Sequence, residues 1–175
     1  MSTIVIYKSK YGSSKQYAEW ISEALGCEMT EAKKISAKDL EVYDTIILGG
    51  GLYAEIIAGV SLITKNFDRL RSKKLIVFTT GITPVDLREY YDTIVIEKNF
   101  KPHMTDKIKV FNFSGKMILS ELTPVHRAAL KTLKKIMSSK PNPTEMEKLL
   151  VKLCDANGDF GNRDEITPLI EYAIS

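Results

Sequence analysis

The feature that most constrains the fold is a short β-branched run near the start of the chain, which leads through a polar loop into a helical pattern. Residues Thr3–Tyr7 are apolar without alternation, as is typical of a strand buried on both faces of a sheet. The polar segment Lys8–Ser14 follows, and apolar residues then recur at helical spacing over residues 14–25. Ser13 and Gln16 have the spacing of a capping box. The chain is therefore predicted to begin with a strand, a loop and a helix.

The same unit recurs further along the chain. At two later places a strand-like segment ends in glycine and is followed by a helical pattern. Because each connection between parallel strands packs a helix back onto the sheet, this alternation predicts an α/β fold. We expect a doubly wound parallel sheet of five strands, covered by helices on both faces. The expected strands are Thr3–Tyr7, Glu28–Ile35, Tyr43–Leu48, Lys74–Thr80 and Ile108–Phe113, and the expected helices between them are Ser14–Leu25, Ser61–Leu70 and one that starts near Pro84.

After the last expected strand the pattern changes to helices alone. Helical spacing is found over Thr123–Lys140, Glu145–Cys154 and Pro168–Ile174. A chain of 175 residues has about the length of one domain. We therefore interpret residues 1–175 as a single domain in which the part from about 114 to 175 is a helical elaboration.

Cysteine usage and hydropathy indicate the compartment. Cys27 and Cys154 lie far apart and match no disulfide or zinc pattern. The chain contains no signal-peptide pattern and no run of about 20 apolar residues. The segment Asp155–Asp159 begins like a calcium loop, but the glycine and the glutamate that such a loop needs further on are absent. We expect a cytoplasmic protein without a metal site.

The charge of the chain is nearly balanced in total but unevenly distributed. Twenty-five Lys and Arg residues against 22 Asp and Glu residues leave a formal net charge of +3, from which no nucleic-acid partner is expected. Between Val125 and Lys152, seven basic residues occur with two acidic ones. The favoured interpretation is a solvated basic face. The alternative is that the basic helix over residues 123–140 contacts an acidic membrane surface or an acidic partner.

The loop after the first strand has the chemistry of a phosphate site. Ligands of an open α/β sheet bind beyond the carboxyl ends of the strands, where the amide groups of the next helix favour an anion. Three serine hydroxyls and Gly12 lie in this loop, with lysines on either side. One glycine satisfies neither the GxxxxGK[ST] nor the GxGxxG pattern, so a mononucleotide is favoured over a nucleoside triphosphate or a dinucleotide.

Three segments together resemble the flavodoxin-like FMN proteins. Ile4–Tyr7 with Ser9–Ser14 (SKYGSS) is similar to the phosphate loop of that family, roughly [ST]-x-T-G-x-[ST]. Tyr43–Tyr53 resembles the second strand and loop of the family, and Thr79–Ile82 resembles the third. The later part of the chain is more similar to the flavodoxin-domain branch that includes menaquinone-dependent protoporphyrinogen dehydrogenase than to short carrier flavodoxins.

The resemblance implies a flavodoxin-like sandwich with strand order 2-1-3-4-5 and FMN as the cofactor. Tyr11 stands where the family commonly has a small hydroxyl residue, and Tyr53 is the candidate for stacking on the flavin. The residues that the resemblance assigns to the FMN phosphate are Ser9, Lys10, Tyr11, Gly12, Ser13 and Ser14, and those that it assigns to the isoalloxazine ring are Gly50, Gly51, Leu52, Tyr53, Thr80, Gly81 and Ile82.

The resemblance further implies an oxidoreductase whose chemistry resides in the flavin, so no catalytic side chain is assigned. Electrons or hydride would pass through non-covalent FMN to a quinone, a porphyrinogen-type compound or another small substrate. Two alternatives stay open. One is a flavodoxin-type electron carrier that docks a redox protein, and the other is a flavin-free binding or regulatory module on the same fold.

Overall fold

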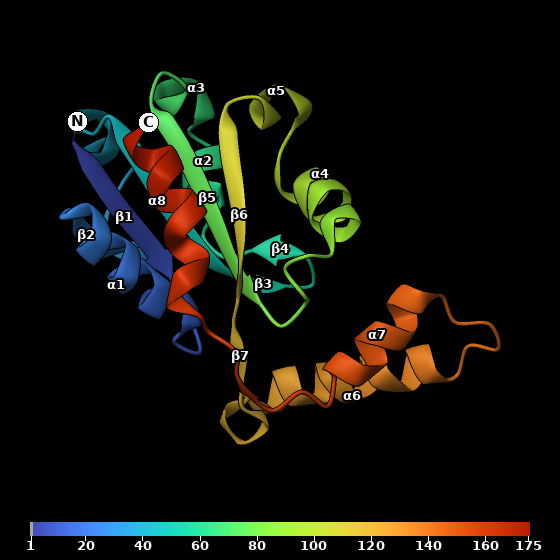
Figure 1. Ribbon diagram of the computed structural model, residues 1–175. Helices are drawn as coiled ribbons and strands as arrows, with labels where there is room; N and C mark the ends of the chain where they lie inside the picture. Colours follow the sequence, from blue (N-terminus) through green and yellow to red (C-terminus); the bar gives the residue numbers. More distant parts are fainter. Residues whose placement is uncertain (1) are drawn as a thin grey trace. The chain divides into compact units, whose positions relative to one another are not determined.

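The computed structural model describes residues 2–175, which divide into two compact units (Figure 1). The first unit extends to Gly115 and resumes with Gly161–Ser175, and the second unit is Lys116–Phe160. The elaboration expected over residues 114–175 therefore comprises two different parts. One is an inserted segment that forms the second unit, and the other is a C-terminal segment that belongs to the first.

The first unit contains five parallel strands: β1 (Thr3–Lys8), β2 (Glu28–Glu31), β3 (Thr45–Tyr53), β5 (Lys74–Gly81) and β6 (Ile108–Ser114). They are hydrogen-bonded in the order β2-β1-β3-β5-β6. Counted along the chain, this is the order 2-1-3-4-5. The predicted α/β fold and its strand order are therefore confirmed.

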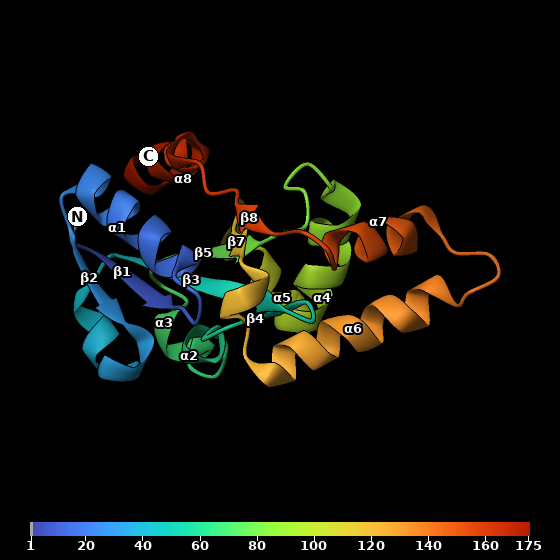
Figure 2. The same cartoon turned by 90° about the horizontal axis from the view of Figure 1, so that it is seen from below.

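Helices cover both faces of this sheet, as Figure 2 shows. On one face lie α1 (Ser13–Leu25) and α8 (Thr167–Ile174), and on the other lie α2 (Ser61–Thr64), α3 (Phe67–Leu70), α4 (Ile96–Asn99) and α5 (Pro102–Thr105). Under α1 and α8, the ring of Tyr17 stacks on Phe113 with 4.8 Å between ring centres. Phe78 packs against both rings, and all three side chains are buried. This aromatic cluster buries a large apolar area on that face of the sheet.

The helix expected over Ser61–Leu70 is interrupted, so that prediction is wrong in detail. Asn66 has a φ of −116°, outside the helical range, and separates α2 from α3. Its side-chain amide donates to the Leu62 carbonyl at 2.9 Å. In a continuous helix that carbonyl would accept from the backbone amide of Asn66, which instead donates to Ile63 at 3.1 Å. The asparagine side chain thus competes with the helix at this point.

The second strand is shorter than predicted. β2 ends at Glu31 instead of Ile35, because Ala32–Lys34 form a 3₁₀ turn. Both lysines of this turn are exposed. Short strands and exposed lysines are common at the edge of a sheet, where they oppose pairing with another chain.

The helix expected from near Pro84 starts later, at Arg88. It continues as a wider π-helical turn over Tyr90–Val95 and then as α4. The hydroxyl of Tyr91, within that turn, donates to the Thr83 carbonyl at 2.9 Å. This bond holds the segment before the helix in a non-helical turn.

The second unit consists of two helices and a two-stranded ribbon: β7 (Lys116–Met117), α6 (Pro124–Ser138), α7 (Glu145–Leu153) and β8 (Gly158–Asp159). β7 and β8 pair antiparallel. Thr144 and Glu147 form a capping box at the start of α7, and Lys134 of α6 donates to the Asp155 carboxylate at 2.7 Å. Both helices were expected from the sequence at nearly these positions.

The surface of α6 combines apolar and basic side chains. Val125 is 75% exposed and Ile136 is 53% exposed, and the helix contains no acidic residue. Its contact with an acidic membrane surface or an acidic partner stays a prediction. Along residues 2–175, no helix is both long and apolar enough to cross a membrane.

The glycines at the end of β3 give a direct test of this packing. A Cβ at Gly49 would lie 1.8 Å from the Phe78 ring, which is fully buried. We expect Gly49→Ala to lower the free energy of unfolding by about 3 kcal/mol, because a packed core cannot make room for it. The control is Gly81→Ala, whose Cβ would meet Leu52 at an ordinary 3.6 Å. Urea unfolding of both variants checks this, and equal losses of stability would contradict the packing described.

Candidate functional site

Three loops meet at the carboxyl edge of the sheet. The strand register places Lys8 of β1 beside Gly50 of β3, and Gly51 of β3 beside Thr80 of β5. The loop after β1, the end of β3 and the end of β5 are therefore neighbours in space. This is the edge at which open α/β sheets bind their ligands.

The first loop ends at Gly12, where helix α1 starts. Gly12 occupies the N-cap position of α1 with a φ of 97°, a left-handed conformation that suits glycine. Its amide donates to the Ser9 hydroxyl at 3.1 Å. Because Gly12 and not Ser13 takes the N-cap position, and glycine has no side chain to form a cap, the capping box expected from Ser13 and Gln16 is wrong. The first amide groups of a helix have no acceptor within it, and here no carboxylate lies in the first turn to oppose an anion.

A buried hydrogen bond joins the first loop to the third. The hydroxyls of Ser14 and Thr80 lie 2.8 Å apart, and the two residues are only 2% and 4% exposed. Buried hydroxyls without a partner are costly, so this pair fixes the distance between the two loops.

The second loop differs from the sequence prediction, because β3 does not end before the glycines. It continues through Gly49, Gly50 and Gly51 to Tyr53 and then turns back into β4 (Ile56–Ile57). A Cβ at Gly50 would lie 2.0 Å from the backbone oxygen of Ala58. Glycine at this position therefore allows the returning chain to lie directly against β3.

The turn between β3 and β4 has an unusual backbone. Ala54 and Glu55 both have positive φ, at 47° and 62°. Left-handed residues other than glycine cost on the order of 1–3 kcal/mol each unless their surroundings hold them. Two neighbouring residues of α4 contact this turn: Asn99 donates to the Glu55 carbonyl at 2.6 Å, and Lys98 pairs with the Glu55 carboxylate at 2.6 Å.

An aromatic pair joins the second loop to the first. The rings of Tyr11 and Tyr53 are tilted at 58°, with 6.4 Å between their centres. The amine of Lys10 lies 5.7 Å from the centre of the Tyr11 ring. Burial, and to a lesser extent the nearby Tyr11 phenol, together raise the pKa of Tyr53 to about 12. Tyr11, which departs from the family pattern, thus contributes its ring to this edge of the site.

Hydrogen bonds at the end of β6 hold the third loop in place. The Gly81 carbonyl accepts from the Gly115 amide at 2.6 Å. Ser114, which pairs with Gly81 in the sheet, donates both its amide and its hydroxyl to the Glu165 carboxylate, each at 2.7 Å. Glu165 also accepts from the Tyr17 hydroxyl at 2.7 Å. The end of β6 is therefore fixed to α1 and to the segment before α8.

The structure brings most of the predicted site residues into pairs. Ser9 contacts Gly12, Ser14 contacts Thr80, Tyr11 contacts Tyr53 and Lys10, and Leu52 lies beside Gly81. Ile82 follows Gly81 as a half-buried residue outside the strand. In residues 2–175 no group of three or more His, Cys, Asp or Glu side chains is arranged to hold a metal ion.

Three residues that contact the ends of these loops were not expected from any sequence pattern. Asn99, Tyr91 and Glu165 lie in segments without a recognisable motif, and each acts on a residue at least eight positions away in the chain. For Asn99, the usual signal of a two-residue hairpin, an Asn-Gly pair, is missing because the turn is Ala54-Glu55. Only the folded structure shows what each side chain supports.

Comparison with known proteins identifies the family. A model of the flavodoxin-domain family matches residues 4–144, and the chain therefore belongs to that family. Comparison with curated proteins finds no match.

Solved structures with similarity to the chain include three flavoproteins. A flavodoxin from the domain Archaea is 14% identical over all of both chains, with a TM-score of 0.47. Oxidised Flavodoxin 2 from Bacillus cereus is 20% identical over 65% of this chain and 84% of that chain, with a TM-score of 0.43. A flavoprotein in complex with FMN from Lactobacillus acidophilus NCFM is 16% identical over 65% and 91%, with a TM-score of 0.41. These similarities are low, so the family assignment rests on the family model.

The buried hydroxyl pair predicts energetic coupling between the first and third loops. We expect Ser14→Ala and Thr80→Val each to lower the free energy of unfolding by about 2 kcal/mol, because each leaves a buried hydroxyl without its partner. The double variant should lose at least about 1 kcal/mol less than the sum of the two. Ser22→Ala is the control, since the exposed Ser22 hydroxyl donates only to a carbonyl of its own helix. Additive losses in a double-mutant cycle would show that the two hydroxyls do not interact.

The raised pKa of Tyr53 predicts a loss of stability at alkaline pH. Between its ordinary pKa of 10 and its raised pKa of about 12, this phenol ionises in the unfolded chain but stays neutral in the folded one. The free energy of unfolding therefore falls as pH rises through this range. We expect Tyr53→Phe to show a smaller fall than the unaltered protein when urea unfolding is compared at about pH 9 and about pH 11. The same fall in both proteins would mean that Tyr53 is not desolvated.

Proposed function

We propose that the protein is an FMN-binding flavoprotein oxidoreductase. The observation that carries this proposal is the convergence of three loops at one edge of the sheet, linked by the Ser14–Thr80 hydrogen bond and the Tyr11–Tyr53 ring pair. Membership of the flavodoxin-domain family supports it. The segments Ser9–Ser14, Gly50–Tyr53 and Thr80–Ile82 contain no His, Cys, Asp or Glu, and in this proposal the redox chemistry comes from the bound cofactor.

The residues of the first loop fit a phosphate monoester. Serine hydroxyls and backbone amides at the start of α1 are donors, and no acidic residue stands in its first turn. Lys8 and Lys10 are exposed beside the loop and add positive potential. In this proposal Ser9, Gly12, Ser13 and Ser14 hold the phosphate, with Lys10 and Tyr11 closing the loop.

The second and third loops fit the edge and one face of a planar ring system. Gly50, Gly51 and Leu52 offer backbone close to the ring, and Tyr53 offers an aromatic surface that is half-buried. Thr80, Gly81 and Ile82 border the opposite side. Bound FMN supplies electron or hydride transfer. The protein orients the ring, excludes water from one side of it and places backbone donors and acceptors at its edge.

The substrate in this proposal is a quinone, a porphyrinogen-type compound or another small acceptor, in keeping with the resemblance to menaquinone-dependent protoporphyrinogen dehydrogenase. A flavodoxin-type carrier with a redox protein partner is the alternative. One feature favours the enzyme: the net charge is positive, whereas carrier flavodoxins, by the family resemblance, are typically acidic.

The decisive experiment is a titration of the apoprotein with FMN and with riboflavin, which lacks the phosphate. We expect FMN to bind at one site with quenching of its fluorescence, and riboflavin to bind about 100-fold more weakly, since charge-assisted bonds to the phosphate contribute roughly 3 kcal/mol. Equal affinities would contradict the role of the first loop. Failure of FMN to bind would overturn the proposal in favour of a flavin-free module.

A second measurement separates the enzyme from the carrier. Holoprotein is mixed with a soluble quinone and an excess of a chemical reductant that regenerates the reduced flavin, in the absence of any other protein, and steady-state quinone reduction above the protein-free rate is recorded. Turnover supports the enzyme. Rapid electron exchange with a ferredoxin-type protein, without quinone turnover, would support the carrier.

A further inference from the structure

We infer, on the basis of the function proposed above, that Asn99 is a positioning residue for the flavin site. Asn99 lies at the end of α4 and holds the left-handed turn at Ala54 and Glu55, so that Tyr53 keeps its place beside the first loop. Asn99 does not belong to any of the three loops, and it would act through the turn.

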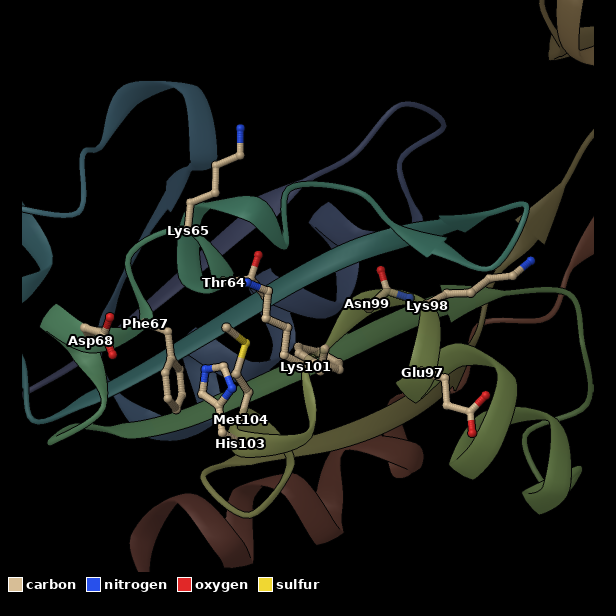
Figure 3. Close-up of a pocket in the computed structure, with 11 residues that line it drawn as sticks. Thr64, Lys65, Phe67, Asp68, Glu97, Lys98, Asn99, Lys101, His103 and Met104 are labelled. Atoms are coloured by element: carbon tan, nitrogen blue, oxygen red, sulfur yellow. The ribbon is translucent and has the colours of Figure 1, made fainter.

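The side chain of Asn99 uses both of its polar atoms. Its Nδ2 donates to the Glu55 carbonyl at 2.6 Å and to the Val95 carbonyl at 2.8 Å, and its Oδ1 accepts from the Ile57 amide at 2.9 Å. Figure 3 shows Asn99 and Lys98 extending from α4 toward the β3–β4 ribbon. These three hydrogen bonds, two to the ribbon and one to its own helical segment at Val95, fix the orientation of the Asn99 side chain.

The turn needs such support, because its sequence does not favour its conformation. A two-residue hairpin loop with positive φ at both positions is best formed by Asn-Gly, whereas Ala54 and Glu55 both carry a Cβ. Tyr53 and Ile56 are the residues that pair on either side of the turn. If the turn relaxed, the position of Tyr53 would change directly.

The helix that carries Asn99 is itself anchored. Val95 is fully buried and Phe100, which follows Asn99, is 5% exposed. By contrast, the ion pair between Lys98 and Glu55 is partly exposed, and such pairs contribute little. Asn99 is thus the contact through which the core holds the turn.

The test is a set of four proteins: the unaltered chain, Asn99→Ala, A54N/E55G, and the triple variant A54N/E55G/N99A. Asn99→Ala should weaken FMN binding about tenfold, because two hydrogen bonds to the turn are lost. A54N/E55G supplies the sequence that favours the turn by itself. The triple variant should therefore bind FMN as tightly as A54N/E55G does. If Asn99 stabilised the fold without acting through the turn, A54N/E55G would not restore FMN binding to the Asn99→Ala protein.

The matched control is Asn66→Ala. Asn66 is another partly buried asparagine, and its amide donates to the Leu62 carbonyl of its own helical segment and not to the turn. The Asn66→Ala variant should leave FMN affinity unchanged. If Asn99→Ala does not fold, Asn99→Asp replaces it, because the carboxylate keeps an acceptor for the Ile57 amide and lacks the donor to Glu55. Unchanged affinity in the Asn99 variant, or a loss that A54N/E55G fails to rescue, would overturn the inference.

Hydrogen exchange separates this inference from the proposed function. The Ala58 amide, next in the chain to the Ile57 amide that Asn99 accepts, donates to the Gly51 carbonyl at 3.0 Å within the ribbon and makes no hydrogen bond to Asn99 itself. In the apoprotein, Asn99→Ala should speed exchange of this amide about tenfold, and A54N/E55G should restore its protection. If the unaltered chain binds no FMN, the proposed function fails, while this readout still decides whether Asn99 holds the turn. Unchanged exchange in Asn99→Ala would overturn the inference.

Discussion

The site depends on how closely the backbone packs at the end of β3. Gly49 lies under the buried ring of Phe78, and Gly50 lies against the backbone of Ala58, with no room for a Cβ at either position. This close approach lets β3 extend beyond its predicted end and fold back as a ribbon. The ribbon carries Tyr53 to the first loop, where its ring lies beside that of Tyr11.

Sequence patterns predict the sheet well because they report burial. The apolar strands and the helices between them indicate a parallel sheet, and a parallel sheet brings the ends of its strands to one edge. The proximity of the first and third loops, joined by Ser14 and Thr80, follows from that topology. Most of the candidate site is therefore predictable from the strand pattern together with three short loop motifs.

The remaining features depend on contacts between residues distant in sequence. Asn66 ends α2 because its side chain takes the place of its own backbone amide, which helical periodicity does not report. Asn99 supports a turn more than 40 positions away. The expected capping box at Ser13 does not form, because Gly12 takes the N-cap position and leaves the amide groups at the start of α1 directed toward the first loop. In each case tertiary structure decides the outcome.

We propose that three loops of the first unit form one site for a mononucleotide. NMR spectra of the backbone amides, recorded while FMN is added to the labelled apoprotein, test this proposal. We expect the largest shift changes to occur together at Ser13 and Ser14, at Tyr53 and at Gly81, with one common affinity. Binding that perturbs only one of these loops, or that leaves all three unchanged, would contradict it.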